Sequence, residues 1–203
     1  MKRGAFITFE GIDGAGKSTQ IEALCEFLKT RGIEVIRTRE PGGTPLGEKI
    51  RDLLLHEDME VSTETLLFFA ARSEHIARVI EPALSRGAWV VSDRFTDATF
   101  AYQVGAKHES PEAVETLEAL VQGALQPNHT VLFDLAPEVA ATRRAKARAA
   151  DRFEKEDLLF FSSVRRAYLD RAERDAKRFF IVDATQTPEV ITEKLLTEAA
   201  SWL

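Results

Sequence analysis

The sequence contains few of the residues that build disulfides and zinc sites. Its 203 residues include one cysteine, Cys25, and four histidines. A single thiol forms no intramolecular disulfide and cannot build a cysteine-based zinc site, and the histidines show no ligand spacing. We therefore assign no function to Cys25 and no metal to the histidines.

Long apolar runs and an excess of positive charge are also lacking. No stretch approaches the ~20 apolar residues of a membrane span, and the short apolar run after Lys2 and Arg3 is typical of a buried strand rather than a signal peptide. The formal net charge of −6 argues against a general nucleic-acid binder, which would usually be basic. These absences favour a cytoplasmic protein with neither a membrane nor a nucleic acid as partner.

The sequence does contain an alternation of short apolar runs and longer helical patterns, which is typical of a parallel α/β sheet. Five runs predict strands, at residues 5–9, 33–37, 88–91, 130–133 and 179–182. The first expected helix follows the first strand, runs to about residue 31 and is capped by Gly32. Four further helices are expected: one that ends near residue 56, one over 62–86, one that begins at 110 and one that begins at 188. With 44% hydrophobic residues, these elements predict one doubly wound domain over residues 1–203.

The helix expected over 62–86 has an unusual apolar pattern. Ser62 is a good N-cap for it, and residues 66–71, LLFFAA, are apolar on nearly every face. Such a helix is buried on more than one side, either in the core or in a subunit interface.

A phosphate-binding motif lies between the first strand and the first helix. Residues 11–18 fit G-x-x-x-x-G-K-[ST] at every defined position. Glycines let backbone N–H groups surround a triphosphate, and the helix N-terminus favours its negative charge. We expect Lys17 to bridge the β- and γ-phosphates and Ser18 to ligate Mg²⁺. The predicted ATP-binding residues are Gly11, Ile12, Asp13, Gly14, Ala15, Gly16, Lys17, Ser18 and Thr19.

Acidic residues at strand ends are the expected partners of that metal. Asp93 ends an apolar strand and is the first choice, acting through water. Asp134 also ends a strand and is its competitor, although an acid there can simply cap a helix. A guanine-reading N-K-x-D motif does not occur, which argues against a GTP-binding switch.

Further residues indicate a second, anionic ligand. Arg94 follows Asp93 and emerges at the carboxyl edge of the sheet, where α/β proteins bind ligands. Phe68 and Arg72 lie one helical turn apart on the same face. An aromatic ring that stacks on a base and a guanidinium that binds its edge would need this arrangement.

Five segments carry a resemblance to a known family. They are FEGIDGAGKST at 9–19, TREPGGTPLGEKIR at 38–51, LLFFAARSEH at 66–75, DRFTDATFAYQ at 93–103 and DRFEKED at 151–157. The sequence resembles the bacterial thymidylate kinases over essentially its whole length. The resemblance implies a nucleoside-monophosphate-kinase-like P-loop fold with a five-stranded parallel sheet between helices. It also implies a short lid, a homodimer, and phosphorylation of dTMP to dTDP by ATP with Mg²⁺.

The resemblance also implies roles for single residues. Phe68 would stack on thymine, Arg72 would bind its carbonyl edge, and Tyr102 would disfavour a ribose. Arg94 would hold the acceptor phosphate as a catalytic residue beside Lys17. The implied dTMP-binding residues are Asp13, Arg39, Glu40, Arg51, Phe68, Arg72, Arg94, Thr99, Tyr102 and Gln103.

The basic stretch 143–152, RRAKARAADR, would form the lid over ATP, within about residues 143–153. Since Ala15 gives the P-loop no arginine, the lid would supply the catalytic one, with Arg148 as first choice and Arg144 as second. Lys146 stands where arginine is usual and the lid is about one residue shorter. Ala98 replaces a usual serine, and Val104 replaces a common glycine.

Three other functions compete with this prediction. The nearest is another small P-loop kinase of a nucleotide or nucleoside, although the acceptor-side arginines favour an acceptor that already carries a phosphate. A non-enzymatic ATP-dependent switch would not need the Phe68 and Arg72 pair. A nucleic-acid binder acting through 143–152 is disfavoured by the overall acidity and by the lack of aromatic residues in that stretch.

Overall fold

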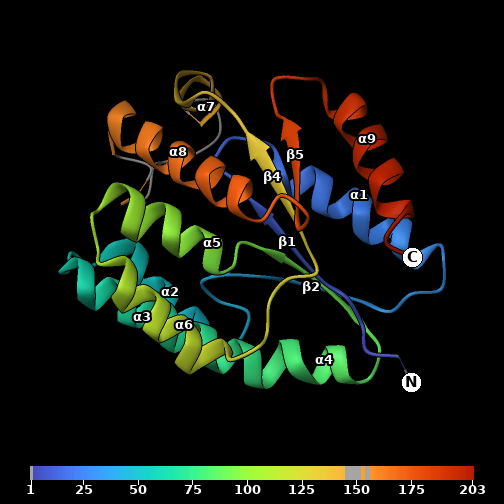
Figure 1. Ribbon diagram of the computed structural model, residues 1–203, viewed down its shortest axis with the longest axis horizontal. Coiled ribbons are helices and arrows are strands. Elements are labelled where there is room, and N and C mark those ends of the chain that lie inside the picture. Colours follow the sequence, from blue (N-terminus) through green and yellow to red (C-terminus); the bar gives the residue numbers. More distant parts are fainter. Residues whose placement is uncertain (1, 145–151, 154–155) are drawn as a thin grey trace.

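The computed structural model describes residues 2–144, 152–153 and 156–203. Arg148 and Lys146 lie outside the described residues, and the side chain of Arg144 is not described either. Figure 1 shows a twisted central sheet between two layers of helices.

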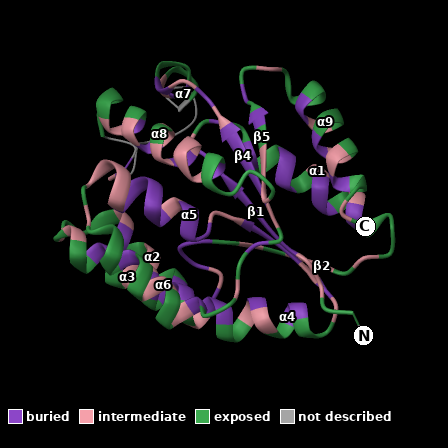
Figure 2. Cartoon of the chain, in the orientation of Figure 1, coloured by how far each residue is buried: buried purple, intermediate pink, exposed green. Residues whose placement is uncertain are grey.

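The sheet contains the five predicted strands, all parallel, in the order β2-β3-β1-β4-β5. They are β1 (Phe6–Glu10), β2 (Val35–Arg39), β3 (Trp89–Asp93), β4 (His129–Asp134) and β5 (Phe179–Asp183). All five residues of β1 are buried, whereas the edge strands β2 and β5 are partly exposed. Figure 2 shows the same gradient. Strands buried on both faces become continuous apolar runs, which explains why the sequence reveals them.

Helices cover both faces of the sheet, in a smaller group on one face and a larger group on the other (Figure 1). The first face carries α1 (Lys17–Lys29) and α9 (Pro188–Ala200), which pack together. The other side carries α2 (Pro45–His56), α3 (Val61–His75), α4 (Glu81–Ser85), α5 (Thr96–Thr99), α6 (Pro111–Gln122) and α8 (Leu158–Arg174). The helix α7 (Pro137–Arg144) follows β4. None of the described helices is long and apolar enough to cross a membrane.

The helix predicted over 62–86 runs through three segments, α3, a π-helical stretch at Ile76–Ile80, and α4. Its predicted N-cap is wrong: Glu60 is the cap residue and makes no side-chain cap hydrogen bond. The predicted role of Gly32 is confirmed. The helix α1 ends at Lys29, and Gly32, at φ 76°, terminates it: the N–H groups of Gly32 and Ile33 donate to the carbonyl oxygens of Lys29 at 2.9 Å and Leu28 at 3.2 Å, which is the Schellman pattern of a helix C-terminus.

The apolar middle of α3 is buried on two sides, as predicted. Phe69 packs in one cluster with Phe100 and Val114, and Ala71 packs in another with Ile50 and Leu54. Leu66 is 55% exposed and Ala70 is exposed as well. One side of the helix therefore remains uncovered in a single chain.

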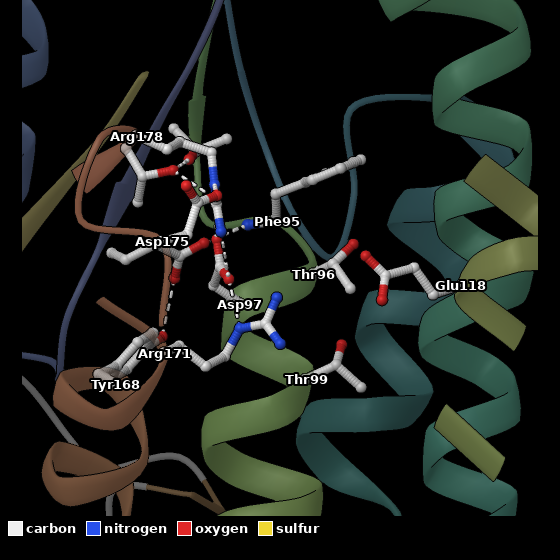
Figure 3. A network of polar contacts seen from close by, with 12 residues as sticks. Phe95, Thr96, Asp97, Thr99, Glu118, Tyr168, Arg171, Asp175 and Arg178 are labelled. Carbon is white, nitrogen blue, oxygen red and sulfur yellow. Dashed lines mark hydrogen bonds and ion pairs between the residues drawn. The ribbon is translucent and has the colours of Figure 1, made fainter. Parts of the chain in front are cut away.

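A buried ion-pair network holds α5 against α8 (Figure 3). Asp97 accepts hydrogen bonds from Arg171 Nε at 2.5 Å and from Arg178 Nη1 at 2.6 Å. Burial alone would raise the pKa of Asp97, but the hydrogen bonds and charges of the two arginines lower it below its ordinary value. The network fixes Tyr168, on the same helix as Arg171, beside the carboxyl ends of the strands.

Candidate active site

A cavity of about 310 Å³ lies at the carboxyl edge of the sheet. It brings the P-loop together with residues from β2, α2, α3, β3 and the helix after β3. Its walls are formed by Asp13, Ser18, Arg39, Glu40, Pro41, Arg51, Leu55, Phe68, Asp93, Arg94, Ala98, Tyr102, Gln103 and Phe153. Eight of the ten predicted dTMP-binding residues are among them, and both predicted metal ligands are as well.

The P-loop has the geometry that its motif predicts. Gly16, with φ 91°, precedes α1, and Gly11 has φ 128°. A Cβ atom on Gly11 would lie 2.6 Å from the carbonyl oxygen of Phe133, so only glycine fits there. Lys17 is buried and its Nζ donates to the carbonyl oxygens of Gly11 at 2.9 Å and Ile12 at 3.3 Å. The carbonyl oxygens of the P-loop backbone thus hold the ammonium group of Lys17 within the loop.

Arg94 faces the P-loop from the end of β3. It has a left-handed backbone, with φ 73°. Its Nη2 donates to Asp13 Oδ1 at 2.9 Å and to the Tyr102 hydroxyl at 3.1 Å, and its Nη1 donates to the Tyr168 hydroxyl at 3.0 Å. The charges of Tyr102, Asp13 and Tyr168 raise the pKa of Arg94 against the opposing effect of burial, so the group is a permanent cation. It is a preorganised donor at the cavity wall.

The two strand-end acids have different surroundings. Asp134 forms a two-pronged ion pair with Arg165, at 2.6 and 2.9 Å. Asp93 lines the cavity with Ser18, and its Oδ1 is buried and has no partner among the described residues. No group of three or more acidic, histidine or cysteine side chains suited to a metal occurs in the described residues. Mg²⁺ does not require one, because it keeps waters and binds substrate phosphates. The residues present therefore fit a Mg²⁺ ion at Asp93 rather than at Asp134.

Arg72 and Thr99 lie behind the cavity wall rather than in it. Arg72 is 1% exposed; its Nε donates to Glu40 Oε2 at 2.8 Å and its Nη2 to Thr99 Oγ1 at 3.1 Å. Its remaining nitrogen, Nη1, is buried without a partner among the described residues. The Nδ1 of His75 donates to the other oxygen of Glu40, at 2.9 Å. A buried donor that has no partner, on a guanidinium held in place, is expected to bind a carbonyl oxygen of a ligand. The predicted role of Arg72 in binding the base therefore stays a prediction.

Four cavity residues were not among the predicted site residues: Pro41, Leu55, Ala98 and Phe153. Phe153 completes an aromatic wall, since its ring centroid lies 6.3 Å from that of Phe68 and 6.1 Å from that of Tyr102. Ala98, the residue that replaces a usual serine, also lines the cavity. Val104 instead packs against the cluster of Phe69, Phe100 and Val114, so a larger side chain than glycine adds to the core there.

A buried carboxyl behind the site was also missed. Glu10 Oε1 accepts a hydrogen bond from the backbone N–H of Phe95 at 2.7 Å, and Oε2 accepts one from the Tyr168 hydroxyl at 2.8 Å. Glu10 thus connects the strand before the P-loop with the residue after Arg94. Burial, together with the negative charge of Asp97, raises the pKa of Glu10 from 4.5 to about 8 despite the nearby Arg94.

This shift predicts a pH-dependent stability. The native state keeps a proton on Glu10 that the unfolded chain releases, so this group makes the unfolding free energy fall as pH rises from about 4.5 to about 8. The Glu10→Gln variant should lose this contribution, so the difference in unfolding free energy between wild type and variant should change across that range. Urea denaturation at several pH values measures it. A difference that stays constant with pH would show that Glu10 titrates normally.

A parallel sheet whose first strand leads into a phosphate-binding loop, beside a cavity lined by arginines and aromatic rings, defines a P-loop nucleotide kinase. A family model described as thymidylate kinase matches residues 9–195. A thymidylate kinase of Methylobacillus flagellatus is 58% identical over 96% of both chains, and one of Burkholderia vietnamiensis is 59% identical over 94% of this chain and 95% of its own. The chain belongs to the thymidylate kinase family.

The fold agrees with that assignment. The crystal structure of thymidylate kinase from Ehrlichia chaffeensis matches with a TM-score of 0.79 and 30% identity, over 97% of this chain and 99% of the other. The enzyme is therefore an ATP-dependent nucleoside monophosphate kinase of α/β fold, as the sequence predicts.

Proposed function

We propose that the cavity binds dTMP with its phosphate toward the P-loop, and that the γ-phosphoryl group of ATP passes in line to it, giving dTDP and ADP. The observation that carries this arrangement is the single cavity that joins Ser18 and Asp13 of the P-loop to an aromatic pocket. Three arginines, Arg39, Arg51 and Arg94, line the same cavity. A bound monophosphate placed base-first in the pocket would direct its phosphate at the loop.

The base end of the proposed site is formed by Phe68, Phe153, Gln103 and the hidden Arg72. Phe68 offers a ring face for stacking on thymine, which is favourable for any flat base. The Nη1 group of Arg72 would donate to a carbonyl oxygen of the base. Tyr102 and Asp13 would flank the sugar, with Tyr102 beside the 2′ carbon. Thr99 contributes by holding Arg72.

The phosphate end relies on positive charge that is already in place. Arg94, Arg39 and Arg51 all line the cavity. Arg39 pairs with Glu48 at 2.7 Å and Arg51 donates to the carbonyl oxygen of Pro41 at 3.0 Å, so neighbouring groups restrain both. Preorganised cations stabilise charge that develops in the transition state without reorganising, and they hold the acceptor oxygen in line.

On the donor side, the backbone N–H groups of the P-loop would surround the ATP phosphates, and Lys17 would contact the transferred group. Ser18 and Asp93 would hold Mg²⁺, which supplies charge neutralisation at the phosphates. We assign the remaining catalytic cation to the lid, residues 143–153, with Arg148 first and Arg144 second. A closed lid would also keep water from the reacting phosphate.

We further propose that the enzyme is one kinase domain that works as a homodimer in the cytoplasm, where ATP is abundant. The exposed side of α3, which includes Leu66, supports a subunit interface, since an apolar helix side in water favours association. Light scattering measures this assembly state directly.

The base assignment predicts a substrate order. dTMP should be turned over best, dUMP less well, and dCMP and purine monophosphates poorly. Cytosine places an amino group where Arg72 needs an acceptor, and an unmatched buried donor costs ~1–3 kcal/mol, which is roughly 10- to 100-fold in kcat/KM. A coupled assay of ADP release over a panel of nucleosides and monophosphates tests this. Equal turnover of dCMP and dTMP would contradict the proposed pocket.

A further inference from the structure

Glu64, on α3, is a fully buried carboxylate beside the base end of the cavity. It is 0% exposed and does not line the cavity itself. It accepts hydrogen bonds from Gln103 Nε2 at 2.8 Å, from Lys107 Nζ at 2.8 and 2.9 Å, and from Arg152. A buried carboxylate bonded to one amide and two cations is costly to assemble unless every contact is retained, which indicates a specific purpose.

The contact with Gln103 fixes the direction of an amide. An ionised carboxylate only accepts hydrogen bonds, so the NH₂ end of the Gln103 amide must face Glu64. Gln103 is 1% exposed and belongs to the cavity wall. Its carbonyl oxygen receives no hydrogen bond from any described residue. With the NH₂ end committed to Glu64, Oε1 is the atom of the amide left for a ligand.

We propose that Glu64 is a positioning residue that sets base specificity, because it turns the Gln103 amide so that an acceptor faces the base. The inference rests on the proposed placement of the base beside Gln103. Thymine and uracil carry an N3–H donor, which Oε1 would accept. Cytosine carries a lone pair at N3, so it would meet the same oxygen acceptor to acceptor, without a hydrogen bond.

The proposed acceptor, Gln103 Oε1, complements a donor, Arg72 Nη1, that a second buried carboxylate holds in place. Arg72 is held by Glu40, as Gln103 is held by Glu64. Together they would present one donor, Arg72 Nη1, and one acceptor, Gln103 Oε1. That pattern matches the O4 and N3–H edge of thymine and mismatches both the amino group and the N3 of cytosine. Sites that leave buried polar groups unpaired with the wrong ligand discriminate strongly.

Two cationic side chains hold the Glu64 carboxylate in place, which the orientation of the Gln103 amide requires. Lys107 and Arg152 both donate to it and both lie near Phe153, with their charged groups 4.6 and 4.9 Å from the ring centroid. Replacing the carboxylate with a neutral amide of equal size would remove the constraint. Glutamine at 64 can donate as well as accept, so Gln103 could present either end to the cavity.

The Glu64→Gln variant tests the proposal through a ratio of kcat/KM values, dTMP over dCMP. This ratio should fall about tenfold or more, through a loss with dTMP and a gain or no loss with dCMP. Glu64→Asp, which still only accepts, should keep a larger part of the ratio. In a Gln103→Leu background, Glu64→Gln should change the ratio no further, because the two residues act through one amide.

A matched control separates positioning from general loosening. Asp97→Asn also neutralises a buried carboxylate bonded to two cations. In the network of Figure 3, however, Asp97 bonds no cavity-lining side chain. The Asp97→Asn variant should therefore have a lower melting temperature and an unchanged ratio of kcat/KM values. If Glu64→Gln does not fold, Glu64→Gln with Lys107→Met removes the uncompensated charge and carries the same test.

The outcomes distinguish this inference from the function on which it rests. An unchanged ratio in folded Glu64→Gln, with a reduced ratio in Gln103→Leu, would overturn the role of Glu64 and leave Gln103 as a base contact. An unchanged ratio in Gln103→Leu would overturn the placement of the base itself. A wild-type enzyme that did not prefer dTMP would contradict the proposed pocket before either variant is made.

Discussion

Replacing Lys17 with methionine should lower kcat by about 10²–10³-fold or more, while the fold is retained. Lys17 is buried at the start of α1, and its Nζ is fixed by the carbonyl oxygens of Gly11 and Ile12. Burial and the charge of Arg94 lower the pKa of this ammonium, while Asp93, Asp13 and Glu10 oppose the shift. The group is therefore a poorly hydrated charge next to the proposed phosphate site, and such a donor acts most strongly on the transition state.

The measurement is kcat and both KM values for Lys17→Met, with the melting temperature of each variant. Lys29→Met is the matched control, because Lys29 lies on the same helix but is exposed and pairs only with Glu26 at 2.6 Å. A group that binds ground state and transition state equally would change KM and not kcat. A near-native kcat in a folded Lys17→Met enzyme would show that Lys17 does not contact the transferred group.

The sequence predicts those elements of the fold that produce a recognisable local sequence pattern. Buried parallel strands become apolar runs, and all five were found within two residues of their ends. Ser110 caps α6 as expected, accepting a hydrogen bond from the N–H of Ala113. The P-loop is a contiguous motif, so its position needs no tertiary information. Three helical segments, over 96–106, 137–144 and 158–174, were not predicted. They follow strands closely or carry many charges, so they lack a clear local pattern.

The contacts that organise the site could not be predicted, because they join residues far apart in the chain. Glu10 and Tyr168 are separated by 158 positions, and Glu64 and Gln103 by 39. Nothing local distinguishes Glu64 from Glu60, the exposed acid that directly precedes α3. The choice between Asp93 and Asp134 was open for the same reason: only the structure shows that Arg165 occupies the second one.

A general consequence is that the site is built from carboxylates that orient longer side chains. Glu40 holds Arg72, Glu64 holds Gln103, and Asp13 accepts from Arg94. Each pair commits part of a polar group to the protein and leaves the rest for a ligand. Such a site recognises a nucleotide through a few atoms held in fixed positions rather than through flexible side chains at the surface.

The last of these pairs predicts the second large effect. Arg94→Ala should lower kcat/KM for dTMP by about 10²–10³-fold, mainly through a higher KM for dTMP, with a small change in the KM for ATP. The variant loses the guanidinium that we propose faces the acceptor phosphate. That guanidinium also lies 2.9 Å from Asp13 Oδ1, so in the variant an anionic acceptor would approach a carboxylate whose negative charge is less compensated.

Arg94→Lys separates charge from geometry. An ammonium keeps the charge but lacks the planar fork that reaches Asp13, Tyr102 and Tyr168 together, so it should recover only part of the loss. Both replacements keep a side chain at the positive φ of 73°, and melting temperatures in the absence of nucleotide show whether the loop tolerates them. If folded Arg94→Ala bound dTMP as the wild type does, measured by calorimetry, the acceptor phosphate would have to be held by Arg39 and Arg51 instead.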